Sequence, residues 1–288
     1  METLSVFKNA ESEAKYLAAY DAVLARWPVS YETIELSTRL GETHIMASGP
    51  KDASPLLLLP GNFDCSLSWF HSVASLSAAH RVYALDTLGD VGKSKARQLP
   101  ANRDGFANWL GDVLDGLHIP AADLMGISYG GFLAVNFALK FKERVRRLIL
   151  LCPGIPLGPF TLQWMIRGMP MILRPSVPTV RWFIKGASTT RNQDDLMHVF
   201  ITGMTSARSM KILRPSIHKD EWKQLQMSIL LLIGDHEIMY EPAKAIRQAK
   251  QLIPHIQAEL IENAGHFLLA DQAEKVNQRM LKFLNGNV

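Results

Sequence analysis

Short apolar segments alternate with amphipathic helical segments over most of this chain. Pro55–Leu59 is a continuous apolar run, which is typical of a strand buried on both faces. Further strands are predicted at Glu32–Ser37, Glu42–Ala47, Arg81–Leu85, Asp123–Ile127, Arg147–Leu151, Ile229–Ile233 and Gln257–Ile261. Helices are expected at about 11–27, 66–78, 104–117, 130–141, 242–252 and 271–284. The alternation predicts an α/β fold with a mostly parallel eight-stranded sheet covered by helices on both faces.

The alternation is interrupted after the sixth predicted strand, between residues 154 and 226. This insert has short helical patterns between prolines, and it carries ten Lys/Arg against four Asp/Glu, which gives +6 and leaves −2 for the remainder. We interpret it as a helical cap over a core of residues 1–153 and 227–288. Seven of the twelve methionines lie between Met165 and Met227. They suit an adaptable apolar pocket, although ordinary packing between helices explains them equally well.

Composition excludes several classes of protein. The net charge of +4 comes without a basic run containing aromatic residues, which argues against nucleic-acid binding. The N-terminus lacks the pattern of a signal peptide, and the longest apolar runs are far below the roughly 20 residues needed to span a bilayer. Cys65 and Cys152 are too few for a disulfide framework. We therefore expect a cytoplasmic protein without membrane insertion, and its oligomeric state is not predicted.

The strongest chemical signal is Gly126-Ile-Ser128-Tyr-Gly130-Gly131, which stands where a predicted buried strand passes into a helix. This is the context of a nucleophile elbow, a sharp turn that lifts a serine hydroxyl out of the sheet. Bulky residues in place of the glycines would collide with that turn. The sequence therefore predicts that Ser128 is a nucleophile.

A serine hydroxyl needs a base, and the base needs a carboxylate partner. His266 follows the last predicted strand, in a loop that can reach the edge of the sheet where Ser128 emerges. The strand before it ends in Gly234-Asp235-His236-Glu237, which offers two acids, Asp235 and Glu237. The predicted order is therefore serine, acid, histidine.

With these motifs the chain resembles the α/β-hydrolase superfamily, and within it the capped carboxylesterase-type members of bacteria. The stretch from Asp86 to Ser94 also resembles a turn of that superfamily. The resemblance favours Glu237 over Asp235 as the acid. It also implies an oxyanion hole formed by the backbone N–H groups of Asn62 and Tyr129, although Pro60 replaces the usual histidine in that loop.

The sequence therefore predicts a serine hydrolase that cleaves small carboxylic esters through an acyl-enzyme on Ser128. Phe63, Met165 and Met169 are expected to contact the substrate. No cofactor or metal is expected, because the apparent P-loop and zinc-helix patterns each lack a required residue. Three alternatives remain: a carbon–carbon bond hydrolase, a lactonase or perhydrolase with the same triad, and a ligand receptor with little turnover.

Overall fold

The computed structural model describes residues 3–155, 157–190, 195–208 and 217–286. Met210, Pro156 and Pro215, which belong to the insert discussed above, lie outside the described residues.

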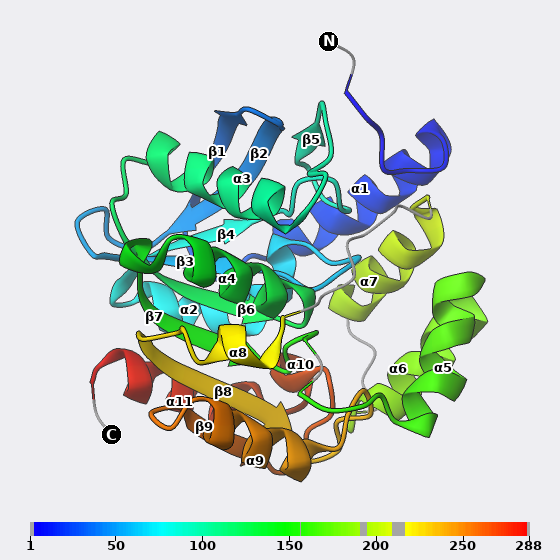
Figure 1. The fold of residues 1–288 in the computed structure, drawn as a ribbon. Helices are drawn as coiled ribbons and strands as arrows, with labels where there is room; N and C mark the ends of the chain where they lie inside the picture. The colour runs from blue at the N-terminus through cyan, green and yellow to red at the C-terminus, as the bar shows by residue number, and fades with distance from the viewer. Residues whose placement is uncertain (1–2, 156, 191–194, 209–216, 287–288) are drawn as a thin grey trace.

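The strands form a single nine-stranded sheet in the order β1-β2-β4-β3-β6-β7-β8-β9, with β5 paired to β2 (Figure 1). Pairing from β4 through β9 along this order is parallel, whereas β2 is antiparallel to each of its neighbours. The expected fold class is confirmed, with one strand more than predicted, because β5 is only two residues long. The strands are β1 Tyr31–Thr38, β2 Gly41–Ser48, β3 Ser54–Leu59, β4 His80–Leu85, β5 Lys95–Ala96, β6 Ala122–Ile127, β7 Val145–Leu151, β8 Ser228–Gly234 and β9 Gln257–Ile261.

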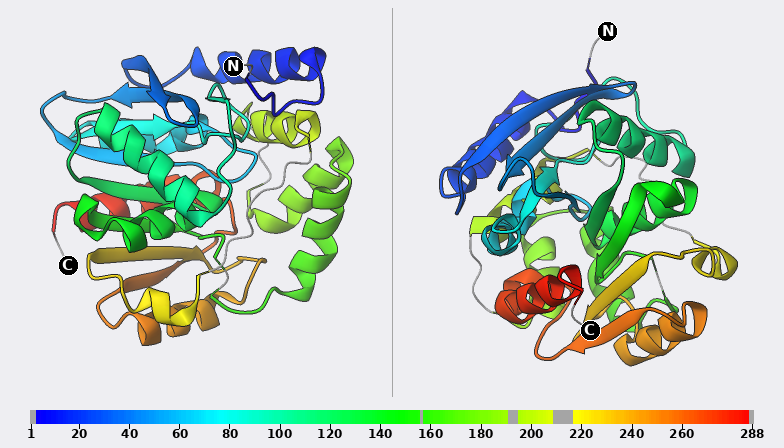
Figure 2. Two further views of the ribbon diagram at one scale, coloured as in Figure 1. Left: turned by 45° about the horizontal axis from the view of Figure 1, so that its top comes forward. Right: turned by 90° about the vertical axis from the view of Figure 1, so that its left-hand side faces the viewer.

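Helices cover both faces of the sheet. On one face lie α3 (Arg103–Gly116), α4 (Tyr129–Lys140) and α9 (Pro242–Leu252), and on the other α2 (Phe70–Ser77) and α11 (Ala273–Leu284) (Figure 2, right). Because both faces are covered, Leu56–Leu59 of β3 are completely buried. The helix expected at 271–284 is α11, which begins at Ala273, and a short helix that was not expected, α10 (Leu268–Asp271), precedes it.

The insert contains α5 (Leu162–Leu173), α6 (Val177–Ala187), α7 (Asp195–Ser206) and α8 (Lys219–Trp222). The first three lie beyond the carboxyl ends of the parallel strands (Figure 2, left). There α7 packs against α1 (Ala10–Leu24), whereas α8 packs against α9 at the side of the sheet. A second hydrophobic cluster lies between the insert helices and the sheet edge, and its buried members include Met171, Phe183, Met197 and Met204.

Parallel pairing determines where the predicted site residues meet. Asn62, Ser128, Glu237 and His266 each follow a different parallel strand, namely β3, β6, β8 and β9. The carboxyl ends of these strands lie along one edge of the sheet, which is the usual location of ligand sites in α/β folds. Among the described residues, no helix has the length and apolar character needed to cross a membrane.

Candidate active site

Ser128 occupies a strained turn between β6 and α4. Its φ of 48° and ψ of −112° lie in the left-handed half of the backbone map, which non-glycine residues rarely adopt. Hydrogen bonds hold the turn on both sides: Ser128 N–H donates to Leu151 O at 3.0 Å, and Gly154 N–H donates to Ser128 O at 2.7 Å. The sharp turn predicted from the glycine pattern is therefore present.

The glycines of the elbow leave no room for a side chain. A Cβ on Gly126 would lie 2.3 Å from the carbonyl oxygen of Gly130. A Cβ on Gly130 would lie 2.3 Å from the carbonyl oxygen of Leu59 on β3. Helix α4 therefore approaches the sheet at a distance that only glycine permits.

A chain of hydrogen bonds links the serine, the histidine and an acid. Oγ of Ser128 lies 3.0 Å from Nε2 of His266, and Nδ1 of the same ring lies 2.6 Å from Oε2 of Glu237. The structure thus brings together three of the predicted residues from strand ends that are far apart in sequence. The distances are those expected for a nucleophile, its base and the group that orients the base.

The two acids that the sequence offered have different partners. Glu237 is 5% exposed, and its second oxygen accepts a hydrogen bond from Met239 N–H at 2.8 Å. Asp235 instead accepts a hydrogen bond from Ala264 N–H at 3.1 Å, two residues before His266. The geometry therefore places Glu237 beside the imidazole, while Asp235 holds the loop that carries it.

Burial and charge act in opposite directions on this pair. Burial by itself would raise the pKa of Glu237, but the charge and hydrogen bond of His266 outweigh it, so the pKa lies below its ordinary value. Burial would likewise lower the pKa of His266, but Glu237 outweighs it and the pKa lies above its ordinary value. The site therefore favours a carboxylate beside a readily protonated imidazole.

Two backbone N–H groups stand free near Ser128. A Cβ on Gly61 would lie 3.7 Å from the Cβ of Ser128, which places the β3 loop containing Asn62 next to Ser128. Tyr129 N–H is the first of helix α4, where backbone donors lack partners within the helix. Within the described part of the chain, neither the Asn62 nor the Tyr129 N–H donates to a protein acceptor. Both donors can thus receive a ligand oxygen.

The sequence analysis did not identify Asp90, whose carboxylate stabilises the loop that carries Asn62. Its Oδ2 accepts a hydrogen bond from Phe63 N–H at 3.0 Å, and its Oδ1 accepts one from Val91 N–H at 2.7 Å. Phe63 needs such support because its φ is 55°. Burial raises the pKa of Asp90 to about 7. The only sequence signal was an acid between Gly89 and Gly92, and no local pattern connects it with a loop 27 residues earlier.

Cys152 lies behind the acid and the imidazole. Its sulfur and one ligand atom each from Glu237 and His266 lie within 4.8 Å of one another, a spacing that could hold a metal ion. However, Glu237 and His266 are already bonded to each other. Burial also raises the pKa of the Cys152 thiol well above its ordinary value, which opposes the thiolate that a metal needs. The cluster is therefore better explained as hydrogen-bonded side chains than as a metal centre.

The predicted substrate contacts lie at different depths. Phe63 is half-buried and packs against both hydrophobic clusters, directly beside the Asn62 loop. Met165 and Met169 are 46% and 36% exposed and lie on α5. Phe183, Phe200 and Phe267 form edge-to-face contacts next to His266. These rings, which the sequence did not single out, give the surroundings of the imidazole an apolar lining.

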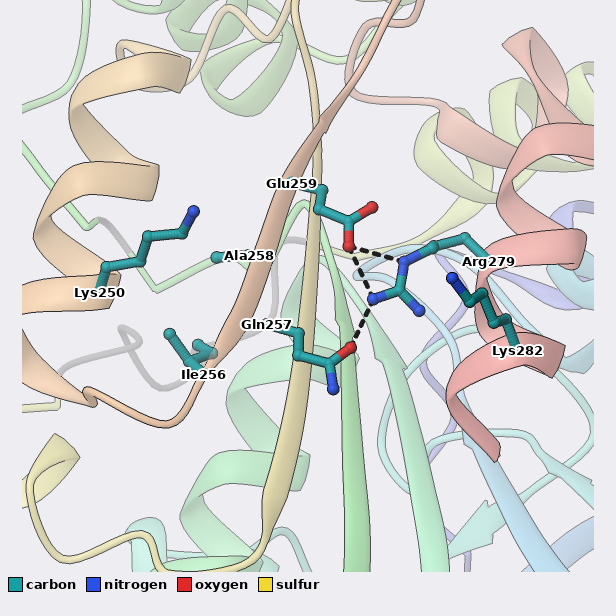
Figure 3. A pocket seen from close by; sticks show the side chains of 7 residues that line it. All are labelled: Lys250, Ile256, Gln257, Ala258, Glu259, Arg279 and Lys282. Atoms are coloured by element: carbon teal, nitrogen blue, oxygen red, sulfur yellow. Dashed lines mark hydrogen bonds and ion pairs between the residues drawn. The ribbon is translucent and has the colours of Figure 1, made fainter. Parts of the chain in front are cut away.

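A hollow of about 410 Å³ lies elsewhere, over the edge strand β9 (Figure 3). Arg279 crosses it to reach Glu259 at 2.6 Å and Gln257 at 2.5 Å, and Lys250 and Lys282 stand at its sides. None of the hydrogen-bonded triad residues lines this hollow. Because the Arg279 guanidinium is already bonded to Glu259 and Gln257, we do not assign a catalytic role to this hollow.

A serine on a strand-to-helix elbow, with an acid and a histidine after later strands, is the arrangement of α/β hydrolases. The chain belongs to the alpha/beta hydrolase family, whose model matches residues 56–279. It is 35% identical to carboxylesterase YbfK of Bacillus subtilis over 98% of this chain and 97% of that protein. The crystal structure of that carboxylesterase matches with a TM-score of 0.90 over 97% of this chain and all of that one. The structure of naproxen esterase from the same organism matches with a TM-score of 0.89 and 32% identity, over 96% of this chain and 99% of that one.

Proposed function

We propose that this protein is a serine hydrolase of small carboxylic esters. The observation that carries the proposal is the chain of hydrogen bonds from Ser128 through His266 to Glu237. Two carboxylesterases that match almost the whole chain support the choice of esters. We further propose that residues 154–226 act as a cap, whose helices α5–α7 lie over the strand ends that carry these residues.

In the proposed mechanism, Oγ of Ser128 attacks the ester carbonyl while Nε2 of His266 takes its proton. Glu237 holds the ring in the tautomer that accepts this proton, and its charge stabilises the imidazolium that forms. The negative oxygen of the tetrahedral intermediate is bound by the N–H groups of Asn62 and Tyr129. One such donor is typically worth about 2.7–4 kcal/mol of barrier.

The intermediate then collapses, and His266 gives its proton to the departing alcohol. Water attacks the acyl group on Ser128, again with His266 as base, and releases the acid. No cofactor takes part in these steps. The apolar surroundings of Phe63 would receive the carbon chains of the ester, whereas Met165 and Met169 lie on the outward side of α5. Two free buried thiols, Cys65 and Cys152, support a reducing compartment such as the cytoplasm.

The test combines turnover of a short-chain p-nitrophenyl ester with labelling by a fluorophosphonate and mass spectrometry of the adduct. We expect turnover by the wild-type protein and the label on Ser128. Ser128→Ala should abolish labelling, and both it and His266→Ala should reduce turnover by on the order of 10⁶.

Two outcomes would overturn the proposal in different ways. A label on Ser128 without ester turnover would show an activated serine with another task, such as carbon–carbon bond hydrolysis or ligand reception. Turnover close to wild type in Ser128→Ala would show that the reaction occurs elsewhere.

A further inference from the structure

Helix α5 has almost no polar face. Its twelve residues, Leu162–Leu173, include only Gln163 and Arg167 as polar side chains. A helix that is apolar on all sides is normally buried on all sides. In this structure α5 is the outermost element on its side of the molecule (Figures 1 and 2).

One side of α5 packs inward. Gly168 and Met171 are buried, and the half-buried Trp164 stacks edge to face on Phe183. The opposite side consists of six large apolar residues that are 36% to 74% exposed, and we call this set the α5 face: Leu162, Met165, Ile166, Met169, Ile172 and Leu173. A contiguous apolar surface of this kind marks a site of interaction.

All charged side chains on α5, on α6 and at the turn between them are positive. The sequence has no Asp or Glu between Glu143 and Asp194. Arg167, Arg174, Arg181 and Lys185 stand on α5, on α6 and at the turn between them, and within the described ranges none of the four forms an ion pair. Arg167 instead lies 4.9 Å from the centre of the exposed Trp182 ring. The partner that satisfies this surface must therefore be apolar and negatively charged.

We propose that the α5 face docks on the surface of an anionic phospholipid bilayer. An amphipathic surface with apolar side chains at its centre and Lys/Arg around it has the composition of helices that lie in the membrane interface. A second copy of this chain fits less well, because a symmetric contact through the α5 face would bring the unpaired cations of two molecules together.

Docking would place the candidate active site just behind the membrane surface. Trp164, on the inner side of α5, contacts Phe183, which contacts Phe267 beside His266. Under the proposed function, this arrangement favours esters that partition into membranes as substrates. The binding itself does not depend on the proposed function, so it can be tested without measuring turnover.

The experiment is co-sedimentation of the full chain with vesicles of phosphatidylglycerol and phosphatidylcholine in equal parts, and with vesicles of phosphatidylcholine alone. We expect binding to the anionic vesicles that falls steeply with added salt, and at least ~10-fold weaker binding to the neutral ones. Arg174→Gln/Arg181→Gln should weaken binding to the anionic vesicles by about 30-fold, at roughly 1 kcal/mol per charge.

Ile166→Gln/Ile172→Gln should weaken binding to the anionic vesicles by at least ~10-fold. The matched control is Leu260→Gln, which removes a 39% exposed leucine on β9 and should bind as the wild type does. Thermal unfolding shows that each variant is folded. The proposal is overturned if the wild type does not sediment with anionic vesicles, or if Ile166→Gln/Ile172→Gln binds them equally well. It is also overturned if the wild type is a dimer by sedimentation velocity and this variant is a monomer, since a second copy then covers the face.

Discussion

The His266 ring has one partner on each nitrogen, Ser128 on Nε2 and Glu237 on Nδ1. The protonation state of the ring therefore determines whether the ring can accept the serine proton. In the proposed mechanism, His266 must be neutral to accept the proton of Ser128. Because Glu237 raises the pKa of His266 above its ordinary value of 6.5, the neutral form appears at higher pH than for a free imidazole. The acid limb of kcat/KM should therefore have its midpoint above 6.5, a value that belongs to the coupled pair.

Glu237→Gln removes the charge that opposes the effect of burial on His266. We expect the acid limb to move to lower pH and the maximal rate to fall on the order of 10⁴-fold. Asp235→Asn, the matched variant two residues away, should leave the limb in place. The measurement is the pH dependence of ester hydrolysis for the three proteins. An unchanged limb in Glu237→Gln would show that this carboxylate does not act on the imidazole.

Asp90 gives a second prediction for a single residue, because it supports the Asn62 loop without being placed to touch substrate. Asp90→Ala removes the acceptor of Phe63 N–H, and kcat should fall by about 10²–10³ if the Asn62 donor is displaced, with KM little changed. Asp90→Asn retains one acceptor oxygen and should recover part of the loss. Asp52→Asn, on an exposed loop, provides a control. A variant with lower thermal stability but unchanged kcat would show that Asp90 has only a structural role.

At the scale of elements, the elbow depends on the close approach of α4 to β3. Gly130→Ala would place a methyl group 2.3 Å from Leu59 O, where neither backbone can easily move. Overpacking of this kind typically costs 1–3 kcal/mol, so we expect the melting temperature to fall by several degrees and turnover to be lost. Gly158→Ala is the matched control, since nothing lies within 4 Å of its added Cβ. Equal melting temperatures for the two variants would contradict this account of the elbow.

The sequence predicted those elements whose pattern is local. Pro55–Leu59 and Ile229–Ile233 are apolar over their whole length, and both are strands within one residue of the predicted bounds. The elbow was equally visible, because its glycines and serine are adjacent. By contrast, β5 and α10 were not predicted, because segments of two and four residues are too short to show a period.

The choice between Asp235 and Glu237 could not be made from local pattern. Both residues stand in one turn and both hold part of the His266 segment, one through Ala264 and one through the imidazole. Which of them faces the ring depends on the conformation of that turn. The exposure of one side of α5 could not be predicted either. A segment that is apolar on nearly every side has no periodicity that indicates which side is buried.

At the scale of the whole molecule, the buried apolar residues form two separate hydrophobic clusters. The larger contains the sheet, and the smaller joins α5–α7 to the strand ends. Because α5 has a buried side and an exposed apolar side, it has fewer packing contacts to lose on opening than β6 at the centre of the sheet. Hydrogen exchange followed by mass spectrometry should show amides of α5 at least ~100-fold less protected than those of β6. Equal protection would mean that the insert and the sheet open only together.

The order of the triad along the chain also bears on how the protein is made. Ser128 is synthesised early, whereas Glu237 and His266 follow β8 and β9, so the base lies 138 residues after the serine. A ribosome that has released β6 and α4 has therefore produced the hydroxyl without its base. Until the last parallel strands emerge and join the sheet, the growing chain holds Ser128 without its histidine partner, and under the proposed function the nascent protein is inert toward esters.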